Sequence, residues 1–267
     1  MHHYIDIGVN LTGSSFRDDT AQVIERSVEA GVTKLIITGT DIAHSEQAVR
    51  ICEHWPEYCY ATAGIHPHHA SDYSNTISSE LADMQALDCV VAVGECGLDF
   101  NRNYSSRSDQ IRAFEAQLEI AAETGKPLFL HQRDAHDDFV AMLNSCRDDL
   151  GHVVAHCFTG NVSEAEEYVS MGLHIGITGW ICDDRRGAEL REAVKAIPLD
   201  RIMLETDAPY LLPKDIPNEC YAAPVKKGRN EPCFLPHVAD TVARYMGVEP
   251  AELAEAALAN TRRVFAL

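Results

Sequence analysis

The stretch Val90-Val-Ala-Val-Gly-Glu-Cys-Gly-Leu-Asp-Phe100 decides how the rest of the chain is interpreted. Its first five residues are small or apolar and rich in valine, which predicts a buried strand over Val90–Gly94. The acidic residue Glu95 follows directly. In a barrel of parallel strands the active site lies where the strands end. We therefore expect Glu95 to point into such a site.

The same arrangement, an apolar run followed by a residue type that can bind metal, recurs three times. The runs are Pro127–Leu130 before His131, Val153–Ala155 before His156, and Ile202–Leu204 before Glu205-Thr206-Asp207. The spacings from Glu95 through the two histidines to Asp207 are 36, 25 and 51 residues. The first two correspond to one strand-helix unit each and the third to two units. This regularity predicts that all four side chains lie on one rim.

Strand-like and helix-like stretches alternate along the whole chain. The remaining strand candidates are Tyr4–Val9, Lys34–Thr38, Tyr60–Ile65 and His174–Thr178, and clear amphipathic stretches are Thr20–Ala30, Asp109–Thr124 and Ala188–Ala196. Eight strands, each followed by a helix-like stretch, indicate a parallel sheet. With 267 residues, the predicted fold class is α/β, a single (β/α)8 TIM-type barrel domain over residues 1–267.

Composition excludes several classes of protein. No stretch is long and apolar enough to cross a membrane, and the nine cysteines contain no CxxC pair, which is typical of reduced thiols in the cytoplasm. The formal net charge of −19 disfavours general binding to nucleic acid, although metal ions and a few local arginines could still hold a phosphate. We expect a monomeric cytoplasmic enzyme that does not bind membranes.

The residues at the strand ends have the chemistry of a metal site. Imidazole and carboxylate groups in an otherwise apolar mouth suit Zn²⁺, Mn²⁺ or a similar divalent ion. Such an ion can polarise a phosphoryl or carbonyl oxygen and lower the pKa of water. Two histidines and two acids behind successive apolar runs therefore predict a metal centre built from Glu95, His131, His156 and Asp207.

Other residues near the predicted strand ends could contact a substrate. The third strand delivers the histidine cluster Gly64-Ile-His66-Pro-His68-His69, in which His66 suits a general acid or a phosphate contact. Loop arginines suit phosphate groups, and loop aromatics could stack on unpaired bases. The arginines are Arg102, Arg133 and Arg229, and the aromatics are Phe100, Tyr104, Phe158, Trp180 and Tyr210. We expect a long irregular loop over Leu212–Pro236, followed by closing helices.

Five motifs in order resemble the TatD family of metal-dependent deoxyribonucleases over nearly the whole chain. They are Gly94–Phe100, His131-Gln-Arg-Asp-Ala135, His156-Cys-Phe-Thr-Gly160, Glu205-Thr-Asp-Ala-Pro-Tyr210 and Arg229-Asn-Glu-Pro232. Two further motifs, Asp6-Ile-Gly-Val-Asn-Leu11 and Gly176-Ile-Thr-Gly-Trp180, resemble the subgroup for which the family is named. The resemblance implies an amidohydrolase-like TIM barrel. It also implies a 3′→5′ exonuclease that uses Mg²⁺ on single-stranded DNA and RNA, with a part in repair of oxidative DNA damage.

The resemblance also implies roles for individual residues. Glu95, His131 and His156 would be metal ligands, with Zn²⁺ or Mn²⁺ as alternatives to Mg²⁺. Asp207 would face the attacking water as base or second ligand, and His66 would lie near the scissile phosphate. From the residues themselves, we assign Arg133 and Arg102 to substrate binding.

The chain departs from the family pattern at the end of the first strand. The common His-x-His is replaced by Gly8 and Asn10, after Asp6, so one of the two family metal sites is weakened or is filled only when substrate is present. Two competing functions stay open. The same metal site could attack a carbonyl in a small-molecule amidohydrolase or esterase, or in a D-aminoacyl-tRNA deacylase. Alternatively, the chain could be a non-catalytic binding protein that lost turnover with its His-x-His.

Overall fold

The computed structural model describes residues 2–217 and 228–267. The chain forms two compact units. The central unit comprises Thr38–His156, a continuous stretch of chain. The discontinuous unit comprises Met1–Ile37 together with Cys157–Leu267, so it is built from both ends of the chain.

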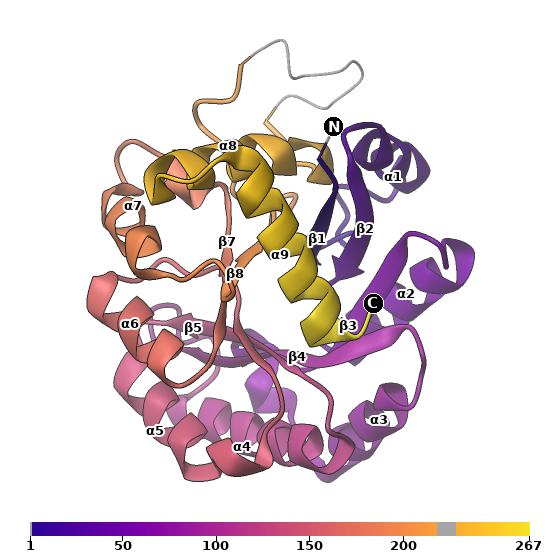
Figure 1. Cartoon of the computed structure of the whole chain (residues 1–267). Coiled ribbons are helices and arrows are strands. Elements are labelled where there is room, and N and C mark those ends of the chain that lie inside the picture. Colours follow the sequence, from indigo (N-terminus) through magenta and orange to yellow (C-terminus); the bar gives the residue numbers. More distant parts are fainter. Residues whose placement is uncertain (1, 218–227) are drawn as a thin grey trace. The chain divides into compact units, whose positions relative to one another are not determined.

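Within the described residues there are eight strands, in sheet order β1 to β8 (Figure 1). They are β1 (Tyr4–Val9), β2 (Val32–Ile37), β3 (Cys59–Ala63), β4 (Val90–Asp99), β5 (Leu128–Arg133), β6 (Val153–Ala155), β7 (His174–Ile177) and β8 (Ile202–Leu204). The strand pairs within each unit are parallel. The predicted fold class, an α/β fold of the (β/α)8 TIM type, is confirmed.

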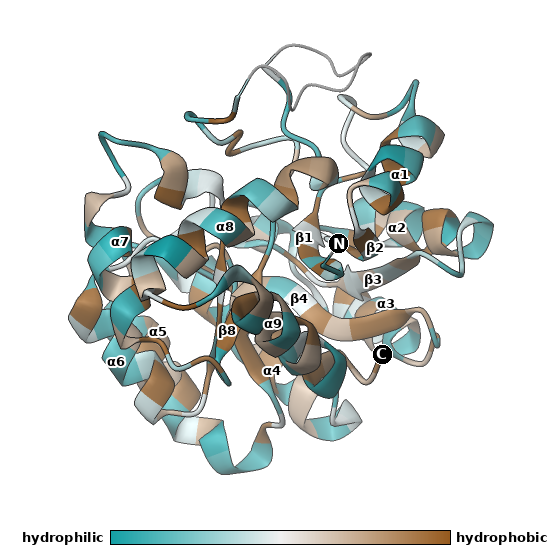
Figure 2. Cartoon of the chain, turned by 45° about the horizontal axis from the view of Figure 1, so that its top comes forward, coloured by the Kyte–Doolittle hydropathy of each residue, from teal (hydrophilic) through white to brown (hydrophobic). Residues whose placement is uncertain are grey.

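Helices connect successive strands. The α-helices are α1 (Thr20–Glu29), α2 (Ile42–His54), α3 (Asn75–Gln85), α4 (Arg107–Thr124), α5 (His136–Cys146), α6 (Val162–Ser170), α7 (Ala188–Ala193), α8 (Leu235–Met246) and α9 (Pro250–Phe265). Short 3-10 helices are η1 (Pro67–Asp72), η2 (Arg147–Asp149), η3 (Gly179–Cys182), η4 (Val194–Ala196) and η6 (Pro232–Phe234). Apolar and hydrophilic residues alternate along these helices (Figure 2), as expected for helices with one face on a sheet.

The longest strand, β4, corrects one prediction. Glu95 does not end the strand, because β4 continues to Asp99 and all ten of its residues are buried. The pairing of β4 with β5 shifts register between Gly94 and Cys96. The backbone N–H of Glu95 donates instead to Gly39 O, at 2.8 Å. This bulge-like irregularity changes the direction of a side chain without ending the strand.

The fifth strand also runs further than the sequence predicts, from Leu128 to Arg133. His131 therefore lies within β5, and Arg133 is the last residue of that strand rather than a loop residue. The boundaries of β1, β6 and β8 agree with the predicted ranges. These three strands are uninterrupted apolar or alternating runs with clear ends, which explains why their ranges could be predicted.

The discontinuous unit joins the two ends of the chain at β1. An isolated bridge pairs Val9 with Ala208, in the segment after β8. The buried carboxylate of Asp6 accepts hydrogen bonds from the backbone N–H and hydroxyl of Thr206. Burial raises the pKa of Asp6 to about 7, although these hydrogen bonds oppose the shift. Residues about 200 positions apart in sequence therefore hold each other in place.

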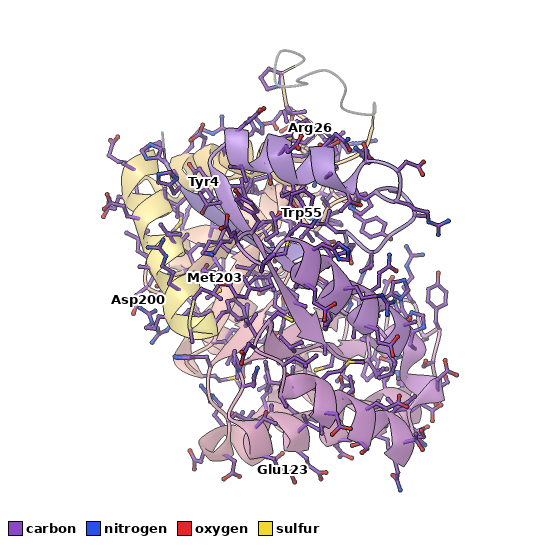
Figure 3. All side chains as sticks on the ribbon, turned by 90° about the vertical axis from the view of Figure 1, so that its right-hand side faces the viewer. Tyr4, Arg26, Trp55, Glu123, Asp200 and Met203 are labelled. Carbon is purple, nitrogen blue, oxygen red and sulfur yellow. The ribbon has the colours of Figure 1, made fainter. Side chains whose placement is uncertain are left out.

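Buried ion pairs also stabilise the discontinuous unit. Arg26, labelled on α1 in Figure 3, pairs with Glu231 at 2.9 Å. Glu231 also accepts from Arg229, whose guanidinium binds Asp19 at 2.8 Å. Arg26 is 8% exposed, Arg229 7% and Glu231 0%, so removing one partner would leave a buried charge unpaired.

Only part of the predicted loop Leu212–Pro236 is irregular in the structure. Its residues 218–227 lie outside the described part of the chain. Pro232–Phe234 form η6, and Leu235 begins α8. The closing helices α8 and α9 are as predicted, and no two cysteines in residues 2–217 and 228–267 form a disulfide. None of the helices in these residues combines the length and apolar character that a membrane span needs.

Gly97→Ala tests the close approach of β4 to β5. Gly97 has φ of 134°, and an added Cβ would overlap the carbonyl oxygen of His131. We expect a loss of about 2–5 kcal/mol in the free energy of unfolding, since backbone strain and overpacking add together. The matched control is Gly125→Ala, where φ is 68° but a Cβ meets nothing within 4 Å. That variant should lose only about 1 kcal/mol. Urea denaturation measures both, and equal losses would contradict the steric explanation.

Candidate metal centre

One carboxylate oxygen in the central unit is surrounded by three imidazoles. Glu95 Oε1 lies 3.0 Å from His131 Nδ1, 3.3 Å from His66 Nε2 and 3.5 Å from His156 Nε2. The four residues come from β4, β5, the end of β6 and the segment after β3. Three of the four were predicted as ligands from their strand ends, and the geometry adds His66 to the same group.

Burial and mutual contact control the charges of this cluster. Glu95 is 5% exposed and His66 is 8% exposed. Burial opposes ionisation of Glu95, but His66, His156 and the hydrogen bond from His131 outweigh it and hold the pKa of Glu95 well below its usual value. Burial lowers the pKa of His66 to about 4. At neutral pH the cluster therefore contains an ionised carboxylate and a neutral His66, which are the forms that bind metal.

Asp99 is a second buried carboxylate beside the cluster. Its Oδ2 lies 2.7 Å from His68 Nε2 and 3.5 Å from His131 Nε2. Its Oδ1 accepts from the backbone N–H groups of Asn101 and Arg102, at 3.0 and 2.8 Å. Burial raises the pKa of Asp99, yet the hydrogen bonds from His131, His68 and Arg102 outweigh it and lower that pKa. Asp99 therefore lies beside Nε2 of His131, whereas Glu95 contacts Nδ1 of the same ring.

Helix α4 fixes the backbone around the cluster through two buried glutamines. The side chain of Gln117 accepts from Ile65 N at 2.7 Å and donates to Ile65 O at 3.1 Å. The side chain of Gln110 makes the same pair of bonds to Asp99 N and O, at 2.8 and 3.1 Å. Glutamines seven residues apart lie on one face of a helix. This face of α4 therefore positions both the residue before His66 and the end of β4.

The donor set fits a divalent metal ion. His66, Glu95 and His131 each offer a ligand atom, and these atoms lie within 4.8 Å of one another. His156 is a fourth candidate through its contact with Glu95. Imidazole nitrogen and carboxylate oxygen are the usual ligands of Zn²⁺ and of related transition metals. Asp99 supplies the outer carboxylate that orients a ligating histidine in such sites.

Asp207 belongs to the discontinuous unit. Its backbone is in the left-handed region, with φ of 54°. Asp207 N donates to Gly8 O at 2.9 Å, and its Oδ1 accepts from Asn10 Nδ2 at 2.9 Å. The two residues that replace the family's His-x-His therefore both hold Asp207, one through its backbone and one through its side chain.

The predicted arginines differ in their surroundings. Arg229 is paired with Asp19 and Glu231, so its guanidinium stabilises the fold. Arg102 and Arg133 are exposed, and neither forms an ion pair with any residue in the described part of the central unit. These two side chains can therefore turn toward a phosphate group.

Sequence reasoning missed the importance of Asp99, although a signal for it was present. Glu95, Gly97 and Asp99 alternate in sequence, so a strand that continues past Glu95 places all three on one face. Ending the predicted strand at Gly94 hid this pattern. The contact of His66 with Glu95 had no comparable signal, because it depends on the Gln117 bonds from a helix more than fifty residues away.

Asp99→Asn is expected to weaken metal binding about 10- to 100-fold, the usual cost of losing an outer carboxylate. The amide oxygen of asparagine can still accept from Asn101 N and Arg102 N, so the fold should remain, whereas the His68 and His131 contacts weaken. Calorimetric titration with Mn²⁺ or Zn²⁺ measures the affinity, and the histidine ring signals in NMR report the orientation of His131. Asp134→Asn, at an exposed carboxylate, is the control. Equal affinities in the two variants would show that Asp99 does not position the ligand.

Comparisons with known proteins agree with this geometry. The family model described as TatD related DNase matches residues 5–266. A protein of Erwinia billingiae (strain Eb661) named 3′-5′ ssDNA/RNA exonuclease TatD is 52% identical, over 98% of both chains. Its namesake in Pectobacterium carotovorum subsp. carotovorum (strain PC1) is 49% identical, over 98% of this chain and 99% of the relative.

Solved structures show the same fold. A TatD homologue from Escherichia coli K12 is 27% identical, with a TM-score of 0.88, over 99% of this chain and 98% of that one. An amidohydrolase from Saccharomyces cerevisiae is 25% identical, with a TM-score of 0.88, over 99% of this chain and 100% of that one. From the motifs, the buried histidine-carboxylate cluster and these matches together, the chain belongs to the TatD-related DNase family and is, as predicted, a hydrolase of the nuclease class.

Proposed function

We propose that this protein is a metal-dependent phosphodiester hydrolase that removes nucleotides from the 3′ ends of single-stranded DNA and RNA. The observation that carries the proposal is the buried Glu95 carboxylate, which has three imidazole nitrogens within 3.5 Å of one oxygen. Two relatives that share about half of their residues with this chain are named 3′-5′ ssDNA/RNA exonucleases. Their names support the choice of substrate and the 3′→5′ direction of digestion. A role in repair of oxidative DNA damage stays a prediction.

We assign Glu95, His131 and His156 as metal ligands, with His66 near the scissile phosphate. A divalent ion held there would supply a Lewis acid for a phosphoryl oxygen and would make water more acidic. We propose Mg²⁺ as the ion that supports catalysis, because Mg²⁺ retains several bound waters and takes its remaining ligands from substrate phosphates. Zn²⁺ or Mn²⁺ suits the imidazole ligands better.

Asp207 is our candidate for the general base. Its Oδ1 accepts from Asn10 Nδ2 at 2.9 Å, and its backbone N–H donates to Gly8 O at 2.9 Å, so the carboxylate is held in one position. The left-handed backbone at Asp207 is an uncommon conformation of the kind found at functional sites. In this proposal Asn10, which replaces a family histidine, fixes the rotamer of the base.

Arg102 and Arg133 are our candidates for binding substrate phosphates. Both are exposed and lie next to Asp99. The backbone N–H of Arg102 donates to Asp99 Oδ1, and Arg133 is the residue of β5 that lies opposite Asp99 of β4 in the strand register. A guanidinium group can bind phosphate in a bidentate manner. In a chain with a formal net charge of −19, local cations of this kind are needed to hold a polyanion.

Tyr104 is a candidate platform for a nucleobase. Its side chain is 67% exposed, so the ring is accessible to a base in solution. The ring packs against His68 with centroids 4.7 Å apart, and His68 is bound to Asp99. An exposed aromatic next to a proposed phosphodiester site suits stacking on an unpaired base.

Three further expectations stay proposals. We propose that the whole chain is one domain, which is supported by a single family model that matches residues 5–266. We also propose that the enzyme is a monomer and acts in the cytoplasm.

The function is tested with single strands labelled at the 3′ or the 5′ end. Purified enzyme is incubated with Mg²⁺, Mn²⁺ or Zn²⁺, and blunt duplex at equal salt is the control. The proposal expects early release of the 3′ label and slower digestion of the duplex. Earlier release of the 5′ label would show that the enzyme digests in the 5′→3′ direction, contrary to the proposal. Turnover of D-aminoacyl-tRNA or of a lactone panel, with DNA left intact, would favour carbonyl chemistry. DNA binding without metal-dependent cleavage would indicate a binding protein.

Asp207→Asn is expected to lower the rate of nucleotide release about 10²- to 10⁴-fold, the usual contribution of a general base. The fold should be kept, because the backbone contact with Gly8 is unchanged. Rates at saturating substrate and metal measure the effect, and Asp18→Asn, at an exposed carboxylate, is the matched control. Parental rates in the Asp207 variant would remove Asp207 from the mechanism.

Tyr104→Ala is expected to raise KM on single-stranded DNA roughly 5- to 150-fold, because stacking of one base contributes about 1–3 kcal/mol. The effect on kcat should be small. Tyr104→Phe keeps the ring and should behave like the parent protein. If the phenylalanine variant is as impaired as the alanine variant, the hydroxyl rather than the ring face is responsible, and the stacking proposal is wrong.

A further inference from the structure

A second group of possible metal ligands lies within the discontinuous unit. It consists of Cys182, Asp215 and His237. One thiol sulfur, one carboxylate oxygen and one imidazole nitrogen from these residues all lie within 4.8 Å of one another. None of the three residues takes part in the proposed phosphodiester hydrolysis, so the group requires an explanation of its own.

Three segments of the discontinuous unit bring these side chains together. Cys182 ends η3, whose first turn is capped by the side chain of Thr178. His237 lies in the first turn of α8, and α8 packs against η3. Asp215 follows β8 in a segment without regular secondary structure. Contacts across three segments, rather than along one helix, give the group a defined geometry.

The exposure of the three side chains suits entry of an ion from solvent. Cys182 is 1% exposed, whereas the side chains of Asp215 and His237 are 38% and 23% exposed. The thiol of Cys182 is therefore the buried ligand of the group, and Asp215 and His237 are the ligands that solvent can reach. The segment that carries Asp215 can adjust its position more easily than a helix can.

The present contacts of the group argue against a nucleophilic cysteine. His237 Nε2 is bound to Asp215 Oδ1 at 2.8 Å. Burial raises the pKa of the Cys182 thiol to about 12, and the thiol contacts Thr241 and the carboxylate of Asp215. A Cys-His-Asp catalytic arrangement needs the thiol against the imidazole, so that the imidazole takes its proton. Here the thiol faces the carboxylate, which does not activate it.

The charges of the group balance when a divalent ion binds. Binding releases the thiol proton to solvent and leaves a thiolate, a carboxylate and a neutral imidazole around the ion, with a net charge of zero. The guanidinium of Arg191 acts on Cys182 but is occupied elsewhere. It donates to Ile181 O at 2.9 Å and to Asp184 Oδ1 at 2.9 Å. Its positive charge is therefore offset by Asp184.

We propose that Cys182, Asp215 and His237 bind a divalent transition-metal ion of the zinc type, separate from the ion at Glu95. Sulfur, nitrogen and carboxylate oxygen ligands lie about 2.0–2.3 Å from zinc, so atoms within 4.8 Å of one another need only small movements to share one ion. The bound ion links the end of η3, the segment after β8 and the first turn of α8. Three protein ligands leave the fourth position to water.

Cobalt titration of the full-length, metal-stripped protein tests the proposal. Co²⁺ bound to a thiolate has a charge-transfer absorption in the near ultraviolet, which the thiolate-free cluster at Glu95 cannot give. We expect this band to reach the intensity of one Co²⁺-thiolate site per chain in the parent protein and to be absent in Cys182→Ser. His237→Gln, which keeps the thiol, should weaken the Co²⁺ affinity measured by the band more than about 100-fold, beyond the cost of losing an outer contact.

Two controls separate this site from other causes. Cys146→Ser removes a free cysteine at the end of α5 and should leave the band unchanged. Glu95→Gln should also keep the band, because it alters only the other cluster. A band that survives in Cys182→Ser, or an affinity that is unchanged in His237→Gln, would overturn the proposal. Because His237 is near the surface, its variant remains informative if loss of the buried thiol impairs folding.

Discussion

The burial of the Glu95 carboxylate is the constraint on which the rest of the central unit depends. A carboxylate removed from water costs several kcal/mol unless charged or hydrogen-bonding partners replace the solvent. Here one oxygen is shared by three imidazoles. These partners lie after β3, within β5 and after β6, and β4 departs from regular pairing with β5 at Glu95, where the three imidazoles meet the carboxylate. The bond from Glu95 N to Gly39 O keeps the backbone satisfied where this departure occurs.

The fold could be predicted from sequence more completely than the site. The short runs Val153–Ala155 and Ile202–Leu204 are wholly apolar, and Tyr4–Val9 alternates apolar side chains around Asp6, so all three strands have clear bounds in the sequence. In β4 the sequence Glu95-Cys-Gly97 breaks the apolar run, so the sequence predicts an end at Gly94, five residues before the observed end at Asp99. Conformational freedom at Gly97 and hydrogen bonds from α4 keep the backbone extended there. Tertiary contacts of this kind do not appear in a local pattern.

The distribution of arginines shows how an acidic chain can present a phosphate site. Arg26 and Arg229 are held by Asp19 and Glu231 within the fold, so their charge is balanced where it lies. Arg102 and Arg133 stand at the surface of the central unit. Under the proposed function, a polyanion would be attracted by these few exposed guanidinium groups rather than by a general positive surface. The sequence places Arg229 in a loop like Arg102 and Arg133, and the ion pairs of Arg229 with Asp19 and Glu231 separate it from those two.

The discontinuous unit has a consequence for the order in which the protein acquires its structure during synthesis. The central unit is one continuous segment and is complete once His156 has left the ribosome. Strand β1, whose six residues are all buried, has to wait for Thr206 and Ala208 before Asp6 and Val9 find their partners. At translation rates of about 5–20 residues per second, a separation of 200 residues means a delay of roughly 10–40 s. For that interval an apolar strand at the beginning of the nascent chain lacks its partner after β8, and chaperones can bind it.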